Sequence, residues 1–401
     1  MAISRASRLP AVENGGMAKQ VIQEARVHEF VEGLFGEDLH AKRVLSLSHV
    51  TLGAIHAVSL AVHAIGQGLA LARRLEKKHA VKQVDRFLSN KGINVWELFP
   101  GWVGFVVAAR PELVVAMDWT EFDEDGHSTI ALNLLTEHGR ATPLVWKTVK
   151  KTELKKRRNE YEDEVLQRLK ESLPSTVTKV TVLADRGFGD SKLYEAMKEE
   201  WGFHFNIRFR GVVLVTSEEG VTRPASEWVP DNGRPRILRN ARVTAEQVPV
   251  PAVVLVHAKG MKEPWILAVS DLELSAAEAV KQYGRRFTIE ETFRDIKDLR
   301  FGMGLSSTRA STPERRDRLF LVSALAISLL TLLGAAGEAV DLERHFKANT
   351  SKKRSYSLFR QGCMYYEFLP TMRAAWAEPL IAKFAELLAQ HRVFTQIFGP
   401  I

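Results

Sequence analysis

Residues 112–123, "ELVVAMDWTEFD", are the stretch in which the pattern of the chain changes from helical to extended. A short apolar run that ends in acidic residues is typical of a buried strand, and Asp118 stands where we expect this strand to end. Before it, the long segment 49–90 is apolar-periodic and free of proline, which indicates helices. We therefore place the boundary between a helical region and a domain of mixed structure near residue 105.

Strand and helix patterns alternate after this first strand. Further strands are expected in "HSTIALNLLTE" (127–137), "ATPLVWKTVK" (141–150), "KVTVLADRGFGD" (179–190) and "FHFNIRFRG" (203–211), with helices at 152–173 and 191–202. This order predicts a mixed α/β domain built around one sheet. Residues 211–274 are rich in Val, Thr, Pro and Gly, and we interpret them as inserted β structure.

The segment that follows the insertion, "YGRRFTIEETFRDIKD" (283–298), holds four basic and four acidic residues. On a helix that turns by about 100° per residue, four polar side chains share a stripe about 60° wide: Tyr283, Arg286, Glu290 and Lys297. The side chains beside that stripe form the expected core face: Ile289, Phe293 and Ile296. A row of partly exposed ion pairs is one interpretation, but the spacing Tyr-x2-Arg-x3-Glu-x6-Lys favours a functional site.

Three carboxylates stand out by position: Asp118, Asp185 and Glu290. One Asp after an apolar run is usually a turn or cap residue, but two on candidate neighbouring strands, with a helical Glu beside them, indicate more. Converging carboxylates repel one another unless a cation lies among them. Ligand sets made only of oxygen suit magnesium or manganese. Two such ions activate a water and stabilise the leaving oxygen of a phosphodiester.

Several neighbouring residues have competing interpretations. We prefer Asp185 to Asp190 as the metal ligand, because Asp190 is better placed to cap the helix that follows. We expect Arg286 and Lys297 to hold backbone phosphates. Two more arginines, Arg208 and Arg210, alternate with apolar residues and either reach DNA phosphates or are solvated on the sheet surface.

These motifs resemble those of the DDE transposases of bacterial insertion sequences, in particular the IS-four-type family. That family's signature is Tyr-x2-Arg-x3-Glu-x6-Lys, and the segment 283–298 matches it at every position. "VAMDWTEFD" and "VLADRGFGD" are similar to the segments that bear the first and second catalytic Asp. The resemblance, which covers roughly 110–300, implies an RNase H-like fold with a β-rich insertion. It implies that two divalent cations, magnesium or manganese, are held by Asp118, Asp185 and Glu290.

The resemblance also implies a function and a domain organisation. A transposase of this type binds the terminal inverted repeats of its element as a homodimer in a synaptic complex, cleaves the ends and joins them to target DNA. It would act in the bacterial cytoplasm, on the nucleoid. We therefore expect a helical basic DNA-binding region (1–105), an RNase H-like catalytic domain (106–304, insertion about 211–274) and a helical C-terminal region (305–401).

Two other functions stay open. A catalytically silent copy would occupy the terminal repeats and inhibit transposition, but the intact triad speaks against it. A stand-alone metal-dependent nuclease would share the fold, but the long, basic N-terminal region favours end recognition. The stretch 73–91 alone carries seven Lys or Arg against two acidic residues, which is typical of a surface that binds polyanions.

One tryptophan has a role that the resemblance implies. Trp265, in "EPWILAVSDL" (263–272), resembles a residue on the strand that follows the insertion. Family members of this type free the element by making a DNA hairpin, and an aromatic face receives the base that the bend expels. Tyr283 and Arg286 would hold the phosphates beside that base. A half-buried strand residue is the other interpretation of Trp265, and Trp228 is a second, weaker candidate for stacking.

Composition agrees with a nucleic-acid partner. The chain has 401 residues and a formal net charge of +8. The single cysteine, Cys363, excludes an internal disulfide and a zinc site of the Cys-cluster type. The first residues, "MAISRASRLPAVENGG", lack the apolar core of a signal peptide. The apolar run from Leu319 is long enough for a membrane span, but its serines, threonine and small residues favour a buried core helix, and we expect no membrane partner.

Overall fold

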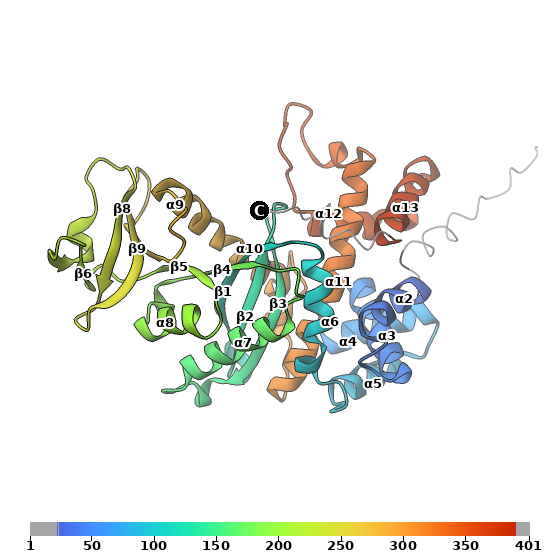
Figure 1. The fold of residues 1–401 in the computed structure, drawn as a ribbon. Coiled ribbons are helices and arrows are strands. Elements are labelled where there is room, and N and C mark those ends of the chain that lie inside the picture. Colours follow the sequence, from blue (N-terminus) through green and yellow to red (C-terminus); the bar gives the residue numbers. More distant parts are fainter. Residues whose placement is uncertain (1–21, 23, 390–401) are drawn as a thin grey trace, which may run out of the picture.

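The computed structural model describes residue 22 and residues 24–389. Residues 1–21, 23 and 390–401 lie outside the described part, and with them the stretch that we inspected for a signal peptide. A single ten-stranded sheet crosses the molecule, and the N-terminal and C-terminal helices gather near one end of it (Figure 1). The chain is thus of the mixed α/β class, as the alternating patterns predicted.

Five strands form the first half of the sheet, and all of them were expected from the sequence. They are β1 (Glu112–Phe122), β2 (His127–Leu135), β3 (Ala141–Lys150), β4 (Lys179–Ala184) and β5 (His204–Arg208). Their order is β3-β2-β1-β4-β5. β1 pairs parallel with β4, and β4 parallel with β5, whereas β1–β2 and β2–β3 are antiparallel hairpins.

The inserted region prolongs the same sheet. Its strands are β6 (Leu214–Thr216), β7 (Thr222–Pro224), β8 (Arg236–Val243), β9 (Val248–Val256) and β10 (Trp265–Val269), which confirms the expected β structure. β10 returns to pair antiparallel with β5, and Leu267 lies opposite Arg208. The remaining strands follow in the order β9-β8-β6-β7 and form the end of the sheet away from the N-terminal helices (Figure 1).

Helices make up the described part of the N-terminal region, as predicted. They are α2 (Glu24–Phe35), α3 (Ala41–Ala57), α4 (Val62–Arg73), α5 (Lys77–Leu88) and α6 (Val95–Val107). The boundary that we placed near residue 105 falls in the last turn of α6. The helix ends at Val107, because the next residue, Ala108, has a φ of 52° that breaks the helical path. β1 begins four residues after Ala108.

The helices beside the sheet are α7 (Arg158–Ser172), α8 (Ser191–Glu199), α9 (Ala276–Gly284) and α10 (Thr288–Lys297). We expected one continuous helix over 283–298, and this was wrong. A 3-10 turn, Arg285–Phe287, separates α9 from α10. Gly284, a poor helix former, stands directly before this tighter turn. The expected core face of α10 is confirmed, because Ile289, Phe293 and Ile296 are all buried.

The C-terminal helices are α11 (Pro313–Ala339), α12 (Leu358–Phe368) and α13 (Ala374–Ala389). α11 is long and apolar enough to cross a membrane, and the bent pair α3–α4 passes the same test together, but 89% of the most apolar window of α11 is buried inside the protein. The prediction of a buried core helix is therefore confirmed. α12 packs closely on α11, because a Cβ at Gly334 or Gly362 would overlap the backbone of the other helix.

Candidate active site

Asp118 and Asp185 lie side by side where two parallel strands separate. The β1–β4 ladder ends at the pair Met117 and Ala184, so the two aspartates are the residues that directly follow this last pair in the chain. Asp185 directly follows β4, as predicted. Asp118 does not end β1, contrary to expectation, because β1 continues to Phe122 as a hairpin with β2.

Arg286 joins the first of these aspartates to Glu290. One of its terminal nitrogens, Nη1, lies 3.2 Å from Asp118 Oδ2, and the other, Nη2, lies 2.8 Å from Glu290 Oε1. The Arg286 side chain is buried, whereas that of Glu290 is 51% exposed. The third nitrogen of the Arg286 guanidinium, Nε, is buried, and its N–H has no hydrogen-bond partner within the described residues. A buried arginine therefore stands where we expected a metal-binding site.

The charges of the other two carboxylates affect the pKa of Asp118. Burial raises the pKa of Asp118 to about 6, although the Arg286 guanidinium lowers it. The negative charges of Asp185 and Glu290 add to the increase in the pKa of Asp118, which places both of them within electrostatic reach of it. The structure thus brings the predicted carboxylates to the same end of the β1–β4 pair.

The fit of this site to a metal ion depends on Arg286. Within residues 24–389, no three His, Cys, Asp or Glu side chains are arranged so that they could hold one ion. The donor chemistry nevertheless suits a hard divalent cation, because the available ligands are carboxylate oxygens alone. Arg286 already occupies one oxygen each of Asp118 and Glu290, so its positive charge takes the place that a cation would have between them.

The other two signature residues contact protein groups. Tyr283 is buried, with only 1% of its surface exposed, and burial raises its pKa. Lys297 Nζ donates to Thr120 Oγ1 at 3.0 Å and to the Glu121 carbonyl at 2.7 Å, which ties the end of α10 to β1. The expected contacts of Tyr283, Arg286 and Lys297 with DNA phosphates stay a prediction.

A comparison with known families decides what this arrangement belongs to. The model of the transposase DDE domain matches residues 111–329, which is more than half of the 401-residue chain. The chain belongs to this family. The match includes all three carboxylates and the whole ten-stranded sheet, together with most of α11. No functionally curated protein matches the chain.

The two candidate tryptophans of the transposase domain differ in their surroundings. Trp265 is half-buried, and its ring centroid lies 5.0 Å from that of Tyr283 and 6.0 Å from that of the exposed Phe287. Trp228 is buried, donates its Nε1–H to the Val215 carbonyl and has the Arg223 guanidinium 3.9 Å above its ring. Trp228 is therefore a core residue of the insertion, whereas Trp265 lies next to the signature segment.

The remaining predicted residues of the domain have clear positions. Arg208 lies on β5 and forms an ion pair of 2.8 Å with Glu263, and its contact with DNA phosphates stays a prediction. Arg210 is exposed beyond the end of β5. Asp190 is the N-cap of α8 and accepts a hydrogen bond from the Lys192 amide, which confirms the expected capping role.

Sequence reasoning missed the contacts that hold α10 on the sheet. Thr292 Oγ1 accepts a hydrogen bond from the Ala141 amide at 2.8 Å and lies 2.7 Å from the Ala141 carbonyl. One turn further on, Asp295 forms an ion pair of 2.6 Å with Arg140. The sequence offered one sign of these contacts, namely a threonine and an aspartate on the buried side of an amphipathic helix. Both contacts fix the helix that carries Glu290.

A second missed contact joins β1 to α7. Trp119, the residue after Asp118, donates its Nε1–H to Glu162 Oε1 on α7 at 2.8 Å. Glu162 is buried, and burial raises its pKa to about 7. A glutamate within the helical pattern of α7 gave no sign of this partner, because 43 residues separate it from Trp119.

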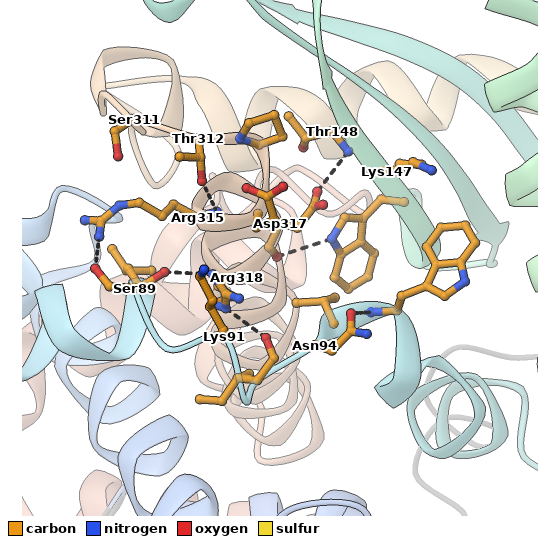
Figure 2. Close-up of a pocket in the computed structure, with 17 residues that line it drawn as sticks. Ser89, Lys91, Asn94, Lys147, Thr148, Ser311, Thr312, Arg315, Asp317 and Arg318 are labelled. Atoms are coloured by element: carbon orange, nitrogen blue, oxygen red, sulfur yellow. Dashed lines mark hydrogen bonds between the residues drawn. The ribbon is translucent and has the colours of Figure 1, made fainter.

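A cavity of about 790 Å³ lies apart from the carboxylates. It is formed by the α5–α6 connection, the edge strand β3 and the first turn of α11, and none of the three carboxylates lines it (Figure 2). Inside it, Asp317 accepts a hydrogen bond from the Thr148 amide, and burial raises the pKa of Asp317 to about 7. Arg315, which also lines the cavity, forms an ion pair of 2.7 Å with Asp85 of α5. The cavity is thus a junction between the N-terminal region and the transposase domain.

Proposed function

We propose that the chain is a cut-and-paste DNA transposase that binds the terminal inverted repeats of its element, cleaves the ends and joins them to target DNA. The observation that carries this proposal is the position of Asp118 beside Asp185, with Arg286 connecting Asp118 to Glu290. The strand order β3-β2-β1-β4-β5, with β1, β4 and β5 parallel, supports an RNase H-like catalytic domain.

Asp118, Asp185 and Glu290 would hold two divalent cations, magnesium or manganese. When bound, such ions supply Lewis-acid activation of the attacking oxygen and neutralise charge on the leaving oxygen. The carboxylates must be ionised for this task, and the neighbouring Arg286 guanidinium favours the ionised form of Asp118. Hydrolysis at each end releases a 3′-hydroxyl, which then attacks the target DNA without a covalent protein–DNA intermediate.

The basic surface of the N-terminal region would recognise the terminal repeats. On α5, the side chains of Lys77, Lys82 and Arg86 are exposed. Such side chains contact phosphates and release counterions. We further propose that two copies form the synaptic complex and that the protein acts on the nucleoid in the bacterial cytoplasm.

Replacement of each carboxylate tests the proposal directly. Asp118→Ala, Asp185→Ala and Glu290→Ala should each abolish cleavage of a terminal-repeat duplex in magnesium, while the affinity for that duplex stays the same. A chelator should stop the unchanged protein in the same way. Asp190→Ala, which removes the cap of α8 and the hydrogen bond from Asn159 Nδ2 but none of the three carboxylates, should keep cleavage. Cleavage at a near-normal rate by one of the three variants would remove that residue from the site.

Two alternatives give different results in the same assays. A catalytically silent end-binding protein would bind the repeat but cut nothing, even with all three carboxylates intact. A stand-alone nuclease would cut DNA but not join the released 3′-hydroxyl to a second duplex. Joined products that carry the element's end would exclude both. Inverted repeats around the gene, bracketed by a short direct duplication, would support the transposase independently.

A further inference from the structure

The turn that follows α10 exposes two large apolar side chains. Leu299 is 74% exposed and Phe301 is 53% exposed. Single exposed apolar residues are common on protein surfaces, but these two flank one arginine, Arg300, on a short turn directly after the helix that carries Glu290. We call Leu299 and Phe301 the apolar tip.

The turn beneath the apolar tip is held by many hydrogen bonds. Asp298 Oδ1 accepts hydrogen bonds from the Arg300 amide at 2.8 Å and the Phe301 amide at 2.6 Å. The Met303 amide donates to the Asp295 carbonyl, and the Met303 carbonyl accepts from the Leu60 amide, each at 2.8 Å. The Met303 side chain is fully buried. The exposure of the apolar tip is therefore part of a fixed turn and not the result of a loose loop.

Two arginines lie beside the aromatic ring of the apolar tip. The Arg300 guanidinium lies 4.9 Å from the centroid of the Phe301 ring, and that of Arg360, on α12, lies 5.9 Å from it. The carboxylate of Asp298 is used inside the turn. An apolar pair with two arginines beside its aromatic ring suits a polyanion that also offers apolar stacked faces, as DNA does. A protein partner would have to supply acidic side chains around an apolar pocket.

The apolar tip also lies close to the carboxylates. Lys297 stands seven residues after Glu290 on α10, a rise of about 10 Å, and it is bonded to β1 just beyond Asp118. Duplex DNA advances about 3.4 Å per base pair. A duplex that has one strand at Asp118 and Glu290 and runs along α10 would therefore pass the apolar tip within about half a helical turn of the scissile phosphate.

We propose that Leu299 and Phe301 insert between base pairs of the duplex held at the carboxylates and kink it there. This inference rests on the proposed function, because it requires DNA at that site. Arg300 and Arg360 would contact the phosphates on either side of the opened step. Apolar side chains that wedge between base steps unstack them and bend the duplex, which is the physical basis for such a role.

The test is the fluorescence of 2-aminopurine, which rises when this base is unstacked. The probe is placed in turn at each position within about half a helical turn of the cleavage site, in one series in the terminal-repeat duplex and in another in the target duplex. The unchanged full-length protein should raise the fluorescence at one step. The double variant Leu299→Ala/Phe301→Ala should bind the same duplex and lose most of that rise. Leu272→Ala, an exposed apolar residue elsewhere, should not change it.

Each outcome decides a separate question. The series in which the rise occurs identifies whether end DNA or target DNA is kinked. A rise of equal size in the double variant overturns the wedge, and so does the absence of any rise although the unchanged protein binds and cuts the duplex. Loss of self-association in the double variant with unchanged fluorescence assigns the apolar tip to a second copy and also overturns it. Failure of the unchanged protein to bind any DNA overturns the proposed function itself.

Discussion

Arg286 is the residue that connects the proposed catalytic groups in this structure. It forms ion pairs with Asp118 and Glu290 while its own side chain is almost inaccessible to water. Removing one partner of a buried pair leaves the remaining charge uncompensated. The state of the carboxylates before metal binding therefore depends on this one guanidinium.

The first prediction concerns the substitution Arg286→Ala. Without magnesium, the variant should be less stable than the unchanged protein by about 2 kcal/mol, because Asp118 loses a hydrogen bond from a charged donor. Magnesium should then raise the melting temperature more in the variant, because the cation no longer competes with the arginine. Thermal melts with and without magnesium measure both effects. Arg294→Ala, which removes an exposed ion pair on the same helix, is the control, and an equal magnesium shift in all three proteins would contradict the competition.

Glu162 gives a prediction about pH. Its pKa is raised from 4.5 to about 7 in the folded protein, so the folded state keeps a proton that the unfolded state releases. The contribution of Glu162 to stability therefore falls as the pH rises through this window and is lowest above pH 7. Glu162→Gln keeps the acceptor for Trp119 but carries no charge. It should be nearly neutral at pH 5 and should stabilise the protein by about 1–2 kcal/mol at pH 8.

Denaturant unfolding at the two pH values measures this difference. Glu160→Gln changes an exposed glutamate two positions away on the same helix and should have no comparable pH dependence. If Glu162→Gln changed the free energy of unfolding equally at pH 5 and pH 8, the carboxyl would not titrate between them in the folded protein.

At the residue scale, the sequence predicted the carboxylates better than their partners. Asp118 and Asp185 each stand at the end of an apolar run, and this pattern is visible in a single segment. The partner of Arg286 on β1 is 168 residues away in the chain, and no local spacing reveals it. The helical stripe indicated that Arg286 and Glu290 are neighbours, but it could not show that Arg286 is also buried against Asp118.

Among the elements, α10 depends on the start of β3 for its position. Thr292→Val removes the hydroxyl that pairs with the Ala141 amide and carbonyl. Buried backbone groups without partners cost about 1–3 kcal/mol, so α10 should shift and misplace Glu290. The cleavage rate at saturating DNA should fall, with little change in the affinity for DNA. Thr292→Ser keeps the hydroxyl and should retain the rate; a similar loss of rate in both variants would contradict the positioning role.

The strand β10 presents Trp265 to the signature segment, and this gives a prediction about the proposed hairpin. Trp265→Ala should leave nicking of the first strand largely intact and impair hairpin formation, because the expelled base loses a stacking surface worth about 1–3 kcal/mol. An abasic nucleotide at the expelled position should partly restore the hairpin. Product analysis on denaturing gels separates the two steps. Equal loss of both steps, together with a lower melting temperature, would assign Trp265 to the core beside Tyr283.

Most elements were predictable from the sequence, but the pairing of distant strands and the break before α10 were not. The strands β1 to β5 follow from apolar runs of strand length, and the β character of the insertion follows from its alternation. The pairing of β10 with β5 was hidden, because the two strands lie more than fifty residues apart. The break between α9 and α10 was missed because Gly284 was the only local sign of it.

At the scale of the whole molecule, the N-terminal region and the transposase domain share a core. α11 packs against α3 and β3, so a fragment that begins near Pro100 would expose the surface that α3 covers. Substitutions on the exposed face of α5 therefore test end recognition better than truncation does.

The triple variant Lys77→Ala/Lys82→Ala/Arg86→Ala should bind the terminal repeat more weakly than the unchanged protein. Each lost phosphate contact lowers the slope of log K against log salt by about 0.9, so the slope should fall by up to about 3. Binding measured between low and physiological salt checks this. Lys198→Ala, an exposed lysine on α8, should leave the slope unchanged, and an unchanged slope in the triple variant would remove α5 from the DNA interface.

The path of α11 has a consequence for damaged copies of the gene. This helix contacts the N-terminal helix α3, the edge strand β3 and both later helices, α12 and α13 (Figure 1). A frameshift or stop codon before Pro313 removes it and uncovers apolar surface in every region at once, so the shortened product should aggregate or be degraded. A missense change at Asp118 leaves α11 in place. Copies of the element that repress their relatives should therefore arise from point mutation and not from a frameshift or stop codon before Pro313.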